Sequence, residues 1–294
     1  MMYAAFCADP LNPRKVEPEY EIEAACARAA GFEVIVIDHD ELDHRIAPDA
    51  ALKPARISDA GSLIYRGWML QAEAYTQLYL ALKAKGIQPL VSPEQYVACH
   101  HGPNSTVPLK KFTPKTEFVL LADLDNESKI DETLSAFAGG GIVIKDWVKS
   151  QASGYWSEAC YIPDSTDHAN AIKVIKRFRE LQAESIVGGI IFKEYVPLLP
   201  IGLPAYEYRA FVVNGNVVGC WPRSSEANQI KSPPRELLDR IASCVESPFV
   251  SVDLSIDEND KWWLLEVGDG QVSGLPVPEA ATDLFETLSA ALSE

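Results

Sequence analysis

The stretch at residues 252–271, VDLSIDENDKWWLLEVGDGQ, indicates the fold more clearly than any other part of the chain. Apolar segments flank a polar turn at residues 257–260, which predicts an antiparallel hairpin. With this turn, Asp253 and Glu266 lie diagonally on one face, roughly 7–8 Å apart, and a turn of another length would break that parity. Unpaired carboxylates in apolar strands are costly, whereas Mg²⁺ needs only one or two of them. We therefore predict a magnesium site at this pair, with Asp269 in the Gly-Asp-Gly bend as a third ligand.

A second strand with a chemical signature lies at residues 142–150, IVIKDWVKS. Lys145 alternates with apolar residues, so it needs an anionic partner or a route to solvent. Lys149 and Ser150 open a loop of small residues that continues to Gly154. Backbone N–H groups of such a loop can approach phosphate oxygens closely while lysines supply point charges. An edge-strand lysine followed by an ordinary turn explains the same pattern.

The strand-like segment at residues 190–197 runs from apolar residues into Lys193-Glu194-Tyr195 and stops at proline. A strand end of this kind presents its backbone to a purine edge, with Lys193 and Glu194 close by. An exposed strand end with a neighbouring charge pair is the plainer interpretation.

Glu207 and Arg209 share one face of the strand-like segment at residues 207–213. The two side chains can pair across a sheet. Arg209 can also clamp a phosphate or a carboxylate in bidentate fashion.

The first hundred residues alternate strand-like segments, at residues 2–7, 33–38 and 62–65, with helix-like ones. This alternation predicts a parallel α/β layer, and no G-x-G-x-x-G turn marks it as a dinucleotide site. We expect a linker at residues 104–114, which are rich in Pro, Thr, Ser and Lys. Asn214-Gly215 predicts a second hairpin.

Two further local predictions concern a helix and a loop. Ile22, Ala25, Cys26 and Ala29 have helical spacing, and Gly31 follows as a C-cap. Residues 151–156 read as a loop of small residues that leads into a strand at residues 159–162.

The formal net charge of −16 makes duplex nucleic acid and anionic membrane surfaces poor partners. The six cysteines form no C-x-x-C pair and match no zinc spacing, so we expect reduced cysteines. No signal-peptide pattern and no apolar run of about 18 residues is present, which predicts a cytoplasmic protein without a membrane span.

Taken together, the motifs resemble those of the ATP-grasp superfamily, in particular the clade named for an arginine and two lysines. The resemblance implies an α/β (α+β) ATP-grasp fold, with a Rossmann-like pre-ATP-grasp domain at residues 1–108 and an ATP-grasp domain at residues 109–294. Two α+β lobes, about residues 109–195 and 196–294, would enclose the nucleotide. The motifs that carry the resemblance are Lys145-Asp146, Lys149-Ser150, Lys193-Glu194-Tyr195, Glu207-Tyr208-Arg209, Asp253, the segment EVGDGQVSGLP at residues 266–276 and YRGWM at residues 65–69.

The resemblance also implies site residues. Phosphate contacts fall on Lys145 and on one further lysine, either Lys149 or Lys193. Ser150 and Gly154 belong to the same ATP-binding set. Glu194 and Tyr195 would lie at the hinge that holds adenine, and Glu207 would bind the ribose. Arg209 and Lys145 would act in catalysis, and Asp253, Glu266 and Asp269 would bind Mg²⁺. Many family members have Asn where this chain has Gly268, so Asp269 is taken as the substitute ligand. Arg66, Gln271 and Ser273 would contact the substrate.

The implied function is an ATP-dependent carboxylate–amine ligase that uses Mg²⁺, acts on small-molecule carboxylate and amine substrates, and passes through an acyl-phosphate. Three alternatives stay open: an ATP-grasp phosphotransferase, a nucleotide-binding module without turnover, and an α/β binding protein unrelated to ATP. The sequence identifies neither substrate and predicts no oligomeric state.

Overall fold

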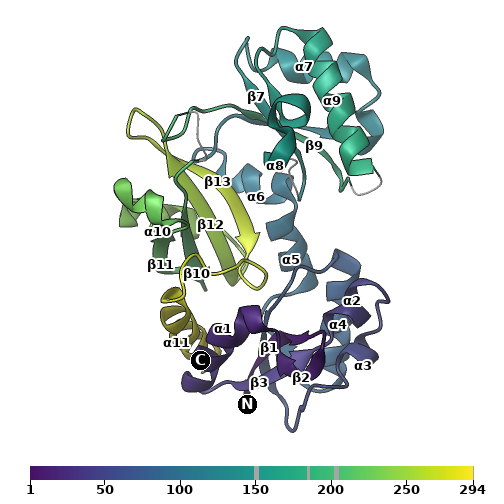
Figure 1. Ribbon diagram of the computed structural model, residues 1–294, viewed down its shortest axis with the longest axis vertical. Helices are drawn as coiled ribbons and strands as arrows, with labels where there is room; N and C mark the ends of the chain where they lie inside the picture. The colour runs from purple at the N-terminus through teal and green to yellow at the C-terminus, as the bar shows by residue number, and fades with distance from the viewer. Residues whose placement is uncertain (149–151, 184–185, 202–204, 294) are drawn as a thin grey trace. The chain divides into compact units, whose positions relative to one another are not determined.

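The computed structural model describes residues 1–148, 152–183, 186–201 and 205–293 (Figure 1). Its contacts divide the chain into two compact units. Unit 1 comprises residues 1–99, 207–253 and 268–294, and unit 2 comprises residues 100–206 and 254–267. The domain boundaries expected from the sequence cut the chain elsewhere, and they stay a prediction.

Unit 1 contains the predicted parallel sheet, which follows the alternation of β-rich and helical segments near the N-terminus. Strands β3, β1, β4 and β5 run parallel in that order, and β2 pairs antiparallel with the end of β1. The strands are β1 (Met2–Asp9), β2 (Asn12–Val16), β3 (Glu33–Ile37), β4 (Gly61–Arg66) and β5 (Ile87–Pro89). The helices of this region are α1 (Glu21–Ala29), α2 (His39–Asp43), α3 (Pro48–Ala51), α4 (Ala72–Ala84) and α5 (Pro93–His100).

Helix α1 forms where the spacing predicts it, and Gly31 follows with a φ of +90°. The residues whose spacing predicts the helix do not form its buried face, because Ile22 is 55% exposed while Ala24 and Ala27 are buried. The buried face of helix α1 also includes Glu23, which forms an ion pair with Arg66 of β4.

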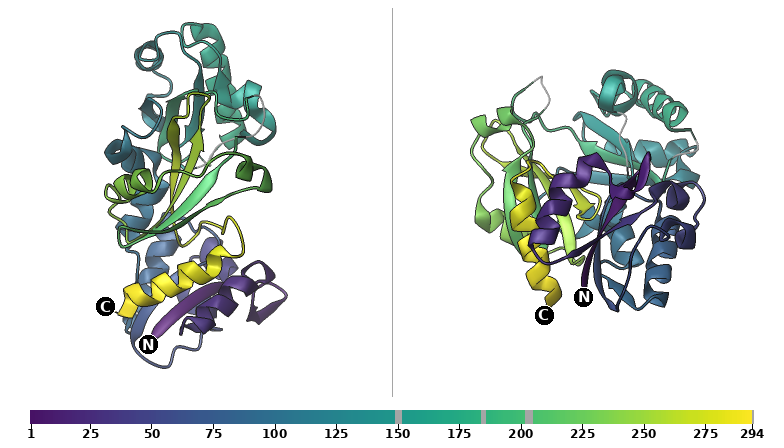
Figure 2. Two further views of the ribbon diagram at one scale, coloured as in Figure 1. Left: turned by 90° about the vertical axis from the view of Figure 1, so that its left-hand side faces the viewer. Right: turned by 60° about the horizontal axis from the view of Figure 1, so that its bottom comes forward.

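The C-terminal parts of unit 1 share one core with its N-terminal sheet. Phe285 of α11 (Ala280–Ser293) packs on Phe6 at 6.2 Å and on Phe32 at 6.0 Å between ring centroids. Helices α1 and α11 lie side by side (Figure 2). Strands β10 (Tyr208–Val213) and β11 (Asn216–Pro222) form the predicted hairpin, and helix α10 (Arg235–Ala242) follows. Asn214 and Gly215 both have positive φ, as a two-residue type I′ turn requires.

The predicted hairpin at residues 249–267 is confirmed by β12 (Phe249–Ile256) and β13 (Trp262–Asp269). These strands belong to a sheet of order β11-β10-β12-β13, and the boundary between the two units falls within both of them. Asp257 closes the turn, since its Oδ1 accepts hydrogen bonds from the backbone of Asn259 at 2.9 Å and of Lys261 at 3.0 Å.

Unit 2 is built on an antiparallel sheet of order β6-β9-β7-β8. Helices α7 and α9 bury their apolar faces in the core of this sheet and lie on the same side of it (Figure 1). The elements are α6 (Gly102–Leu109), β6 (Thr116–Leu120), α7 (Glu127–Ser135), β7 (Ile142–Asp146), α8 (Ala152–Tyr155), β8 (Tyr161–Ile162), α9 (His168–Gln182) and β9 (Gly189–Glu194).

Two local predictions for unit 2 are wrong. The expected linker at residues 104–114 contains most of helix α6, which begins just before it: Pro103 lies in the first turn, where a proline is tolerated, and Pro108 lies near the other end of the helix. The expected loop at residues 151–156 contains α8, and a π-helical turn (Trp156–Cys160) leaves only two residues of the expected strand. Short 3₁₀ turns occur at Pro18–Tyr20, Leu121–Asp123 and Ser225–Gln229.

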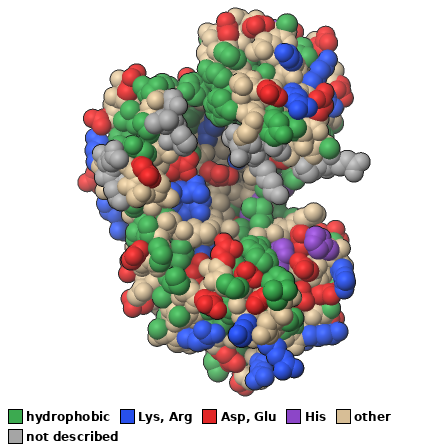
Figure 3. Space-filling model, in the orientation of Figure 1, with side chains coloured by type: hydrophobic (Ala, Val, Ile, Leu, Met, Phe, Trp, Pro, Cys, Tyr) green, Lys and Arg blue, Asp and Glu red, His purple; other side chains and the backbone are tan. Residues whose placement is uncertain are grey.

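Among the described residues, no helix combines the length and the apolar character needed to cross a bilayer. All six cysteines are free thiols, as predicted. Acidic and basic side chains are interspersed on the face shown in Figure 3.

Candidate functional site

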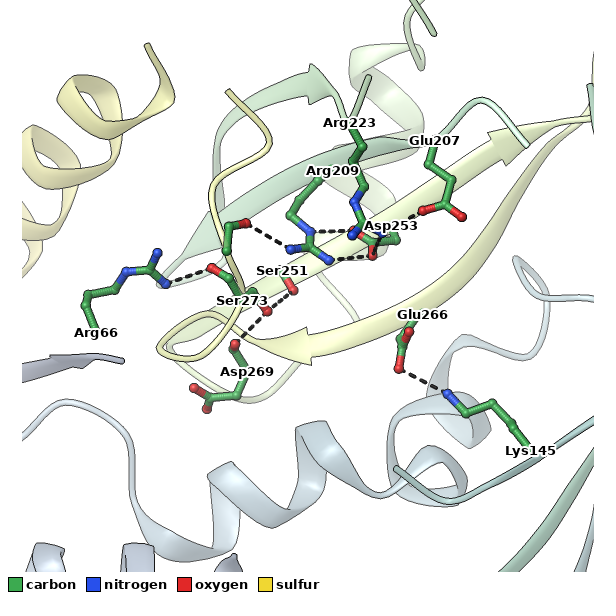
Figure 4. A network of polar contacts seen from close by, with 11 residues as sticks. Arg66, Lys145, Glu207, Arg209, Arg223, Ser251, Asp253, Glu266, Asp269 and Ser273 are labelled. Atoms are coloured by element: carbon green, nitrogen blue, oxygen red, sulfur yellow. Dashed lines mark hydrogen bonds and ion pairs between the residues drawn. The ribbon is translucent and has the colours of Figure 1, made fainter. Parts of the chain in front are cut away.

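The clearest site in unit 2 joins Lys145 of β7 to Glu266 of β13. Lys145 Nζ lies 3.1 Å from Glu266 Oε1 (Figure 4). The Lys145 side chain is 23% exposed and that of Glu266 52%, so ligands can reach the pair. Both line one pocket, whose other lining residues are His100, Gly102, Ser105, Thr106, Thr113, Thr116, Trp147, Ile191, Lys193, Leu264, Leu265 and Val267.

Lys193 of β9 brings a second ammonium group to this pocket. In the sheet it stands opposite Val143 of β7 and Thr116 of β6, and its Nζ donates to the Leu265 carbonyl at 2.7 Å. Burial of the ammonium, together with the nearby charge of Lys145, lowers the pKa of Lys193 to about 8. Lys193 therefore stays mostly cationic at neutral pH, and an anion in the pocket would meet two ammonium groups beside the carboxylate of Glu266.

The backbone N–H groups at the strand end after Lys193 form hydrogen bonds within the protein. The N–H groups of Glu194 and Tyr195 donate to the carbonyls of Lys115 and Gly141, each at 2.8 Å. The Tyr195 ring lies 4.9 Å from that of Tyr161. These two N–H groups are therefore committed to the fold, and the predicted adenine contacts of Glu194 and Tyr195 stay a prediction.

The small-residue loop is only partly described. Lys149 and Ser150 lie outside the described residues. Gly154 is exposed and has a φ of +87°, and a Cβ at this position would meet only open space. Its role toward phosphates stays a prediction.

In unit 1, Arg209 of β10 and Asp253 of β12 form a bidentate ion pair. Arg209 Nε and Nη2 donate to the two Asp253 carboxylate oxygens, each at 2.7 Å (Figure 4). The remaining Nη1 donates to the Gly274 carbonyl at 2.9 Å. The side chains are 13% and 7% exposed, so the pair is largely shielded from solvent.

Arg223 joins the same cluster, and the sequence reasoning missed it. Its Nη1 lies 2.6 Å from Glu207 Oε2 and 3.2 Å from Asp253 Oδ2. Burial raises the pKa of Glu207, and the Arg223 charge opposes this rise. A β-bulge at Phe211 shifts the hairpin register by one residue, which sets Arg209 opposite Trp221. Because the turn alone predicts the unshifted register, the sequence pattern pointed away from Arg223.

Two predicted substrate residues are instead part of the interior of unit 1. Arg66 is 1% exposed, and its Nε and Nη2 donate to Glu23 at 2.7 and 2.8 Å. Its Nη1 donates to the carbonyls of Gly270 and Ser273. Gln271 is fully buried and donates to the Tyr75 hydroxyl at 3.0 Å. Both side chains are therefore used in the interior of unit 1, and their predicted substrate contacts stay a prediction.

Asp269 does not meet the expectation of a third metal ligand. It is fully buried, its Oδ1 accepts from Gln271 N at 2.8 Å, and burial raises its pKa to about 7. The next residue, Gly270, lies so close to Phe249 that a Cβ there would collide with the ring. Within the described parts of the chain, His, Cys, Asp and Glu form no group of three that could hold a metal ion. Asp269 is therefore a buried acid.

Ser273, the third predicted substrate residue, is half-buried. Its hydroxyl lies 2.6 Å from that of Ser251 and donates to the Asp269 carbonyl at 2.8 Å. This network holds the bend after β13, and a substrate contact by Ser273 stays a prediction.

Comparison with known proteins identifies the family of this chain. Residues 136–292 match the model of an ATP-grasp domain family, the third family of the clade named for one arginine and two lysines. The match spans more than half of the chain, so the chain belongs to this family. A comparison with curated proteins gave no significant match.

Solved structures with the same fold include an ATP-grasp RimK domain protein from Sphaerobacter thermophilus. It is 15% identical, with a TM-score of 0.63 and coverage of 99% of this chain and all of that one. The D-cycloserine synthetase DcsG gives 13% identity and a TM-score of 0.66, covering 99% of this chain and all of that chain. The ATP-grasp ligase PsnB, with a precursor peptide and AMPPNP, gives 13% and 0.58, covering 99% and 96%.

These comparisons confirm the predicted family and the predicted ATP-grasp fold class. They also support the predicted enzyme class, an ATP-grasp ligase.

Proposed function

We propose that this chain is an ADP-forming carboxylate–amine ligase that works through an acyl-phosphate. One observation carries the proposal: unit 2 brings Lys145, Lys193 and Glu266 to a single pocket. Two cations and one carboxylate are the groups that a triphosphate and its counter-ion need. Family membership supplies the expectation that the nucleotide is ATP.

The lysines would bind and orient the phosphates. Lys145 and Lys193 come from neighbouring strands of one sheet, so their spacing is set by backbone pairing and not by a loop. Such preorganised cations stabilise charge that develops on the transferred phosphoryl group. The substrate carboxylate would attack the γ-phosphorus and release ADP. An amine would then attack the acyl-phosphate carbon and expel phosphate.

Glu266 fits a divalent cation as a ligand because its carboxylate is half exposed and lies at the pocket. Both oxygens of Asp253 are bound by guanidinium groups, so coordination by Asp253 requires exchange of at least one of these contacts. Bound Mg²⁺ would neutralise negative charge on the phosphates. Glu266 holds the metal in our proposal, without Asp269.

Arg209 would act on the anionic part of the substrate or intermediate. Its guanidinium is held by Asp253 and by the Gly274 carbonyl, which fixes its orientation. A planar, oriented guanidinium suits a carboxylate or an acyl-phosphate. Glu207, bound to Arg223, would contact the ribose.

The substrates are proposed as a class. DcsG is named as a synthetase of D-cycloserine, a small molecule, and PsnB was solved with a precursor peptide. We propose a small or peptide carboxylate and a small amine for this chain.

The test measures ADP release by the full chain with Mg-ATP and pools of carboxylates, peptides and amines, followed by mass spectrometry of products. A ligase sustains ADP release only when an acid and an amine are both present, and its product is an amide. A phosphorylated product that accumulates without any amine would identify a phosphotransferase instead.

A further inference from the structure

Two buried donor groups line the pocket of unit 2 without a partner among the described residues. Thr113 is 7% exposed, and its Oγ1 has no hydrogen-bond partner there. The indole Nε1 of Trp147 is also buried and unpartnered within the same described ranges. Both side chains line the pocket that contains Lys145, Lys193 and Glu266. Buried polar atoms in native proteins are nearly always hydrogen-bonded, so two orphans in one pocket call for an explanation.

The backbone around Thr113 is fixed by hydrogen bonds. Phe112, its neighbour, donates to the Leu109 carbonyl at 2.8 Å, which closes the end of α6. The Phe112 carbonyl accepts from Leu264 N of β13 at 2.9 Å. Thr113 is therefore held between the end of a helix and a strand, and its hydroxyl stays beside the pocket.

Trp147 is equally constrained. Its carbonyl accepts from Gly102 N at 2.9 Å, and the His101 ring lies 5.5 Å from its own. Gly188 packs so closely that a Cβ at that position would collide with the indole. The donors are therefore preorganised, which lowers the entropic cost of binding a ligand.

The chemistry of these groups defines what they bind. An indole N–H and an ammonium group only donate hydrogen bonds, and a threonine hydroxyl donates when it faces an acceptor. With Lys145 and Lys193 at the same pocket, and the carboxylate of Glu266 beside them for a cation, the matching ligand is an anion rich in acceptor oxygens. A phosphate chain with its counter-ion meets these requirements, whereas a single carboxylate offers only two acceptor oxygens.

We propose that Thr113 Oγ1 and Trp147 Nε1 donate hydrogen bonds to phosphate oxygens of the bound nucleotide. This assignment rests on the proposed function and adds two phosphate ligands to it. It places one ligand in the segment between α6 and β6 and the other just after β7, beside the lysines of the sheet.

The test compares affinities for ADP and for adenosine by calorimetry, in the wild type and in Thr113→Val. The substitution keeps the shape and removes the donor. ADP affinity should fall about 10- to 100-fold, the usual effect of losing a hydrogen bond to a charged group, while adenosine affinity stays within about twofold. Trp147→Phe should show the same selectivity for ADP.

Thr133→Val is the matched control. Thr133 is also 7% exposed and also in unit 2, but its Oγ1 already donates to the Lys129 carbonyl at 2.8 Å. This variant should lose thermal stability and keep its ADP affinity. Thr113→Val should keep or gain stability in the absence of ligand, because valine removes an unsatisfied buried hydroxyl.

Unchanged ADP affinity in Thr113→Val would overturn the assignment, as would an equal loss for ADP and adenosine. Failure of the wild type to bind any adenine nucleotide would instead overturn the proposed function, so the two failures are distinguishable.

Discussion

Glu266 combines two roles in this account, as partner of Lys145 and as the metal-binding carboxylate of the pocket. The ion pair is half exposed, so its loss should change the free energy of unfolding by no more than about 1 kcal/mol. The chemistry, in contrast, depends on this carboxylate. We therefore predict that Glu266→Gln lowers ATP-dependent turnover by roughly 100-fold or more while the protein stays folded.

ADP release and circular dichroism measure these two effects. Glu258→Gln is the control, because Glu258 is an exposed carboxylate on the turn of the same hairpin. Retained turnover in Glu266→Gln would remove this residue from the site.

The raised pKa of Asp269 predicts that the free energy of unfolding depends on pH. Burial raises its pKa to about 7 in the folded protein, whereas an unfolded aspartate titrates near about 3.9. Between these values the folded state holds a proton that the unfolded state has released, so this group's contribution to stability falls as pH rises from about 4 to 7. The full difference is on the order of 4 kcal/mol.

Asp269→Asn removes this titration and keeps the acceptor for Gln271 N. Urea denaturation between pH 4 and pH 8 should show a flatter profile for the variant than for the wild type. Parallel profiles would mean that Asp269 does not change its proton binding on folding.

At the scale of elements, the buried pair between Glu23 and Arg66 joins helix α1 to the end of β4. Both side chains are nearly inaccessible, with exposures of 6% and 1%. Removing one charge of a buried pair leaves the other uncompensated, which typically costs about 3–5 kcal/mol. We predict a loss of this size in Glu23→Gln, measured by urea denaturation.

Glu21→Gln gives the comparison on the same helix, since Glu21 is exposed. It should change stability by less than about 0.5 kcal/mol. Equal stabilities of the two variants would show that the Arg66 pair does not hold α1 in place.

Local patterns predicted most elements, and the exceptions have physical causes. The hairpin at Asn214-Gly215 and the strands around Glu266 follow from turn chemistry and alternation. The sequence did not indicate the bulge at Phe211, and so Arg223 was missed. Nor did it indicate the buried ion pair that Arg66 forms with Glu23.

The candidate site shows the same limit. Lys145 and Glu266 were found because each charge interrupts an apolar strand, where an unpaired charge would be costly, and Lys193 was found because an apolar strand ends at it. Asp269 lies at the end of an apolar strand as well, but it is fully buried. Thr113 carries no charge and no motif, so only its buried, unpartnered hydroxyl points to a ligand.

For the whole molecule, nucleotide binding should stabilise the folded state through linkage. A ligand at 100 times its Kd adds about 2.7 kcal/mol, so Mg-ATP should raise the Tm by roughly 5 °C or more. Lys145→Met should weaken this shift, because it removes one of the two ammonium groups at the pocket. Thermal shift assays over a range of ATP concentrations measure the effect, and an identical shift in the variant would exclude Lys145 as a phosphate ligand.

The central claim is that Lys145, Lys193 and Glu266 form the phosphate and metal site of an ATP-grasp ligase. A crystal structure of the full chain with Mg²⁺ and AMPPNP tests it most directly. Our account predicts phosphate oxygens within hydrogen-bond distance of Lys145 Nζ and Lys193 Nζ, with Glu266 coordinating the metal. A nucleotide bound elsewhere, with the ion pair between Lys145 and Glu266 intact, would contradict it.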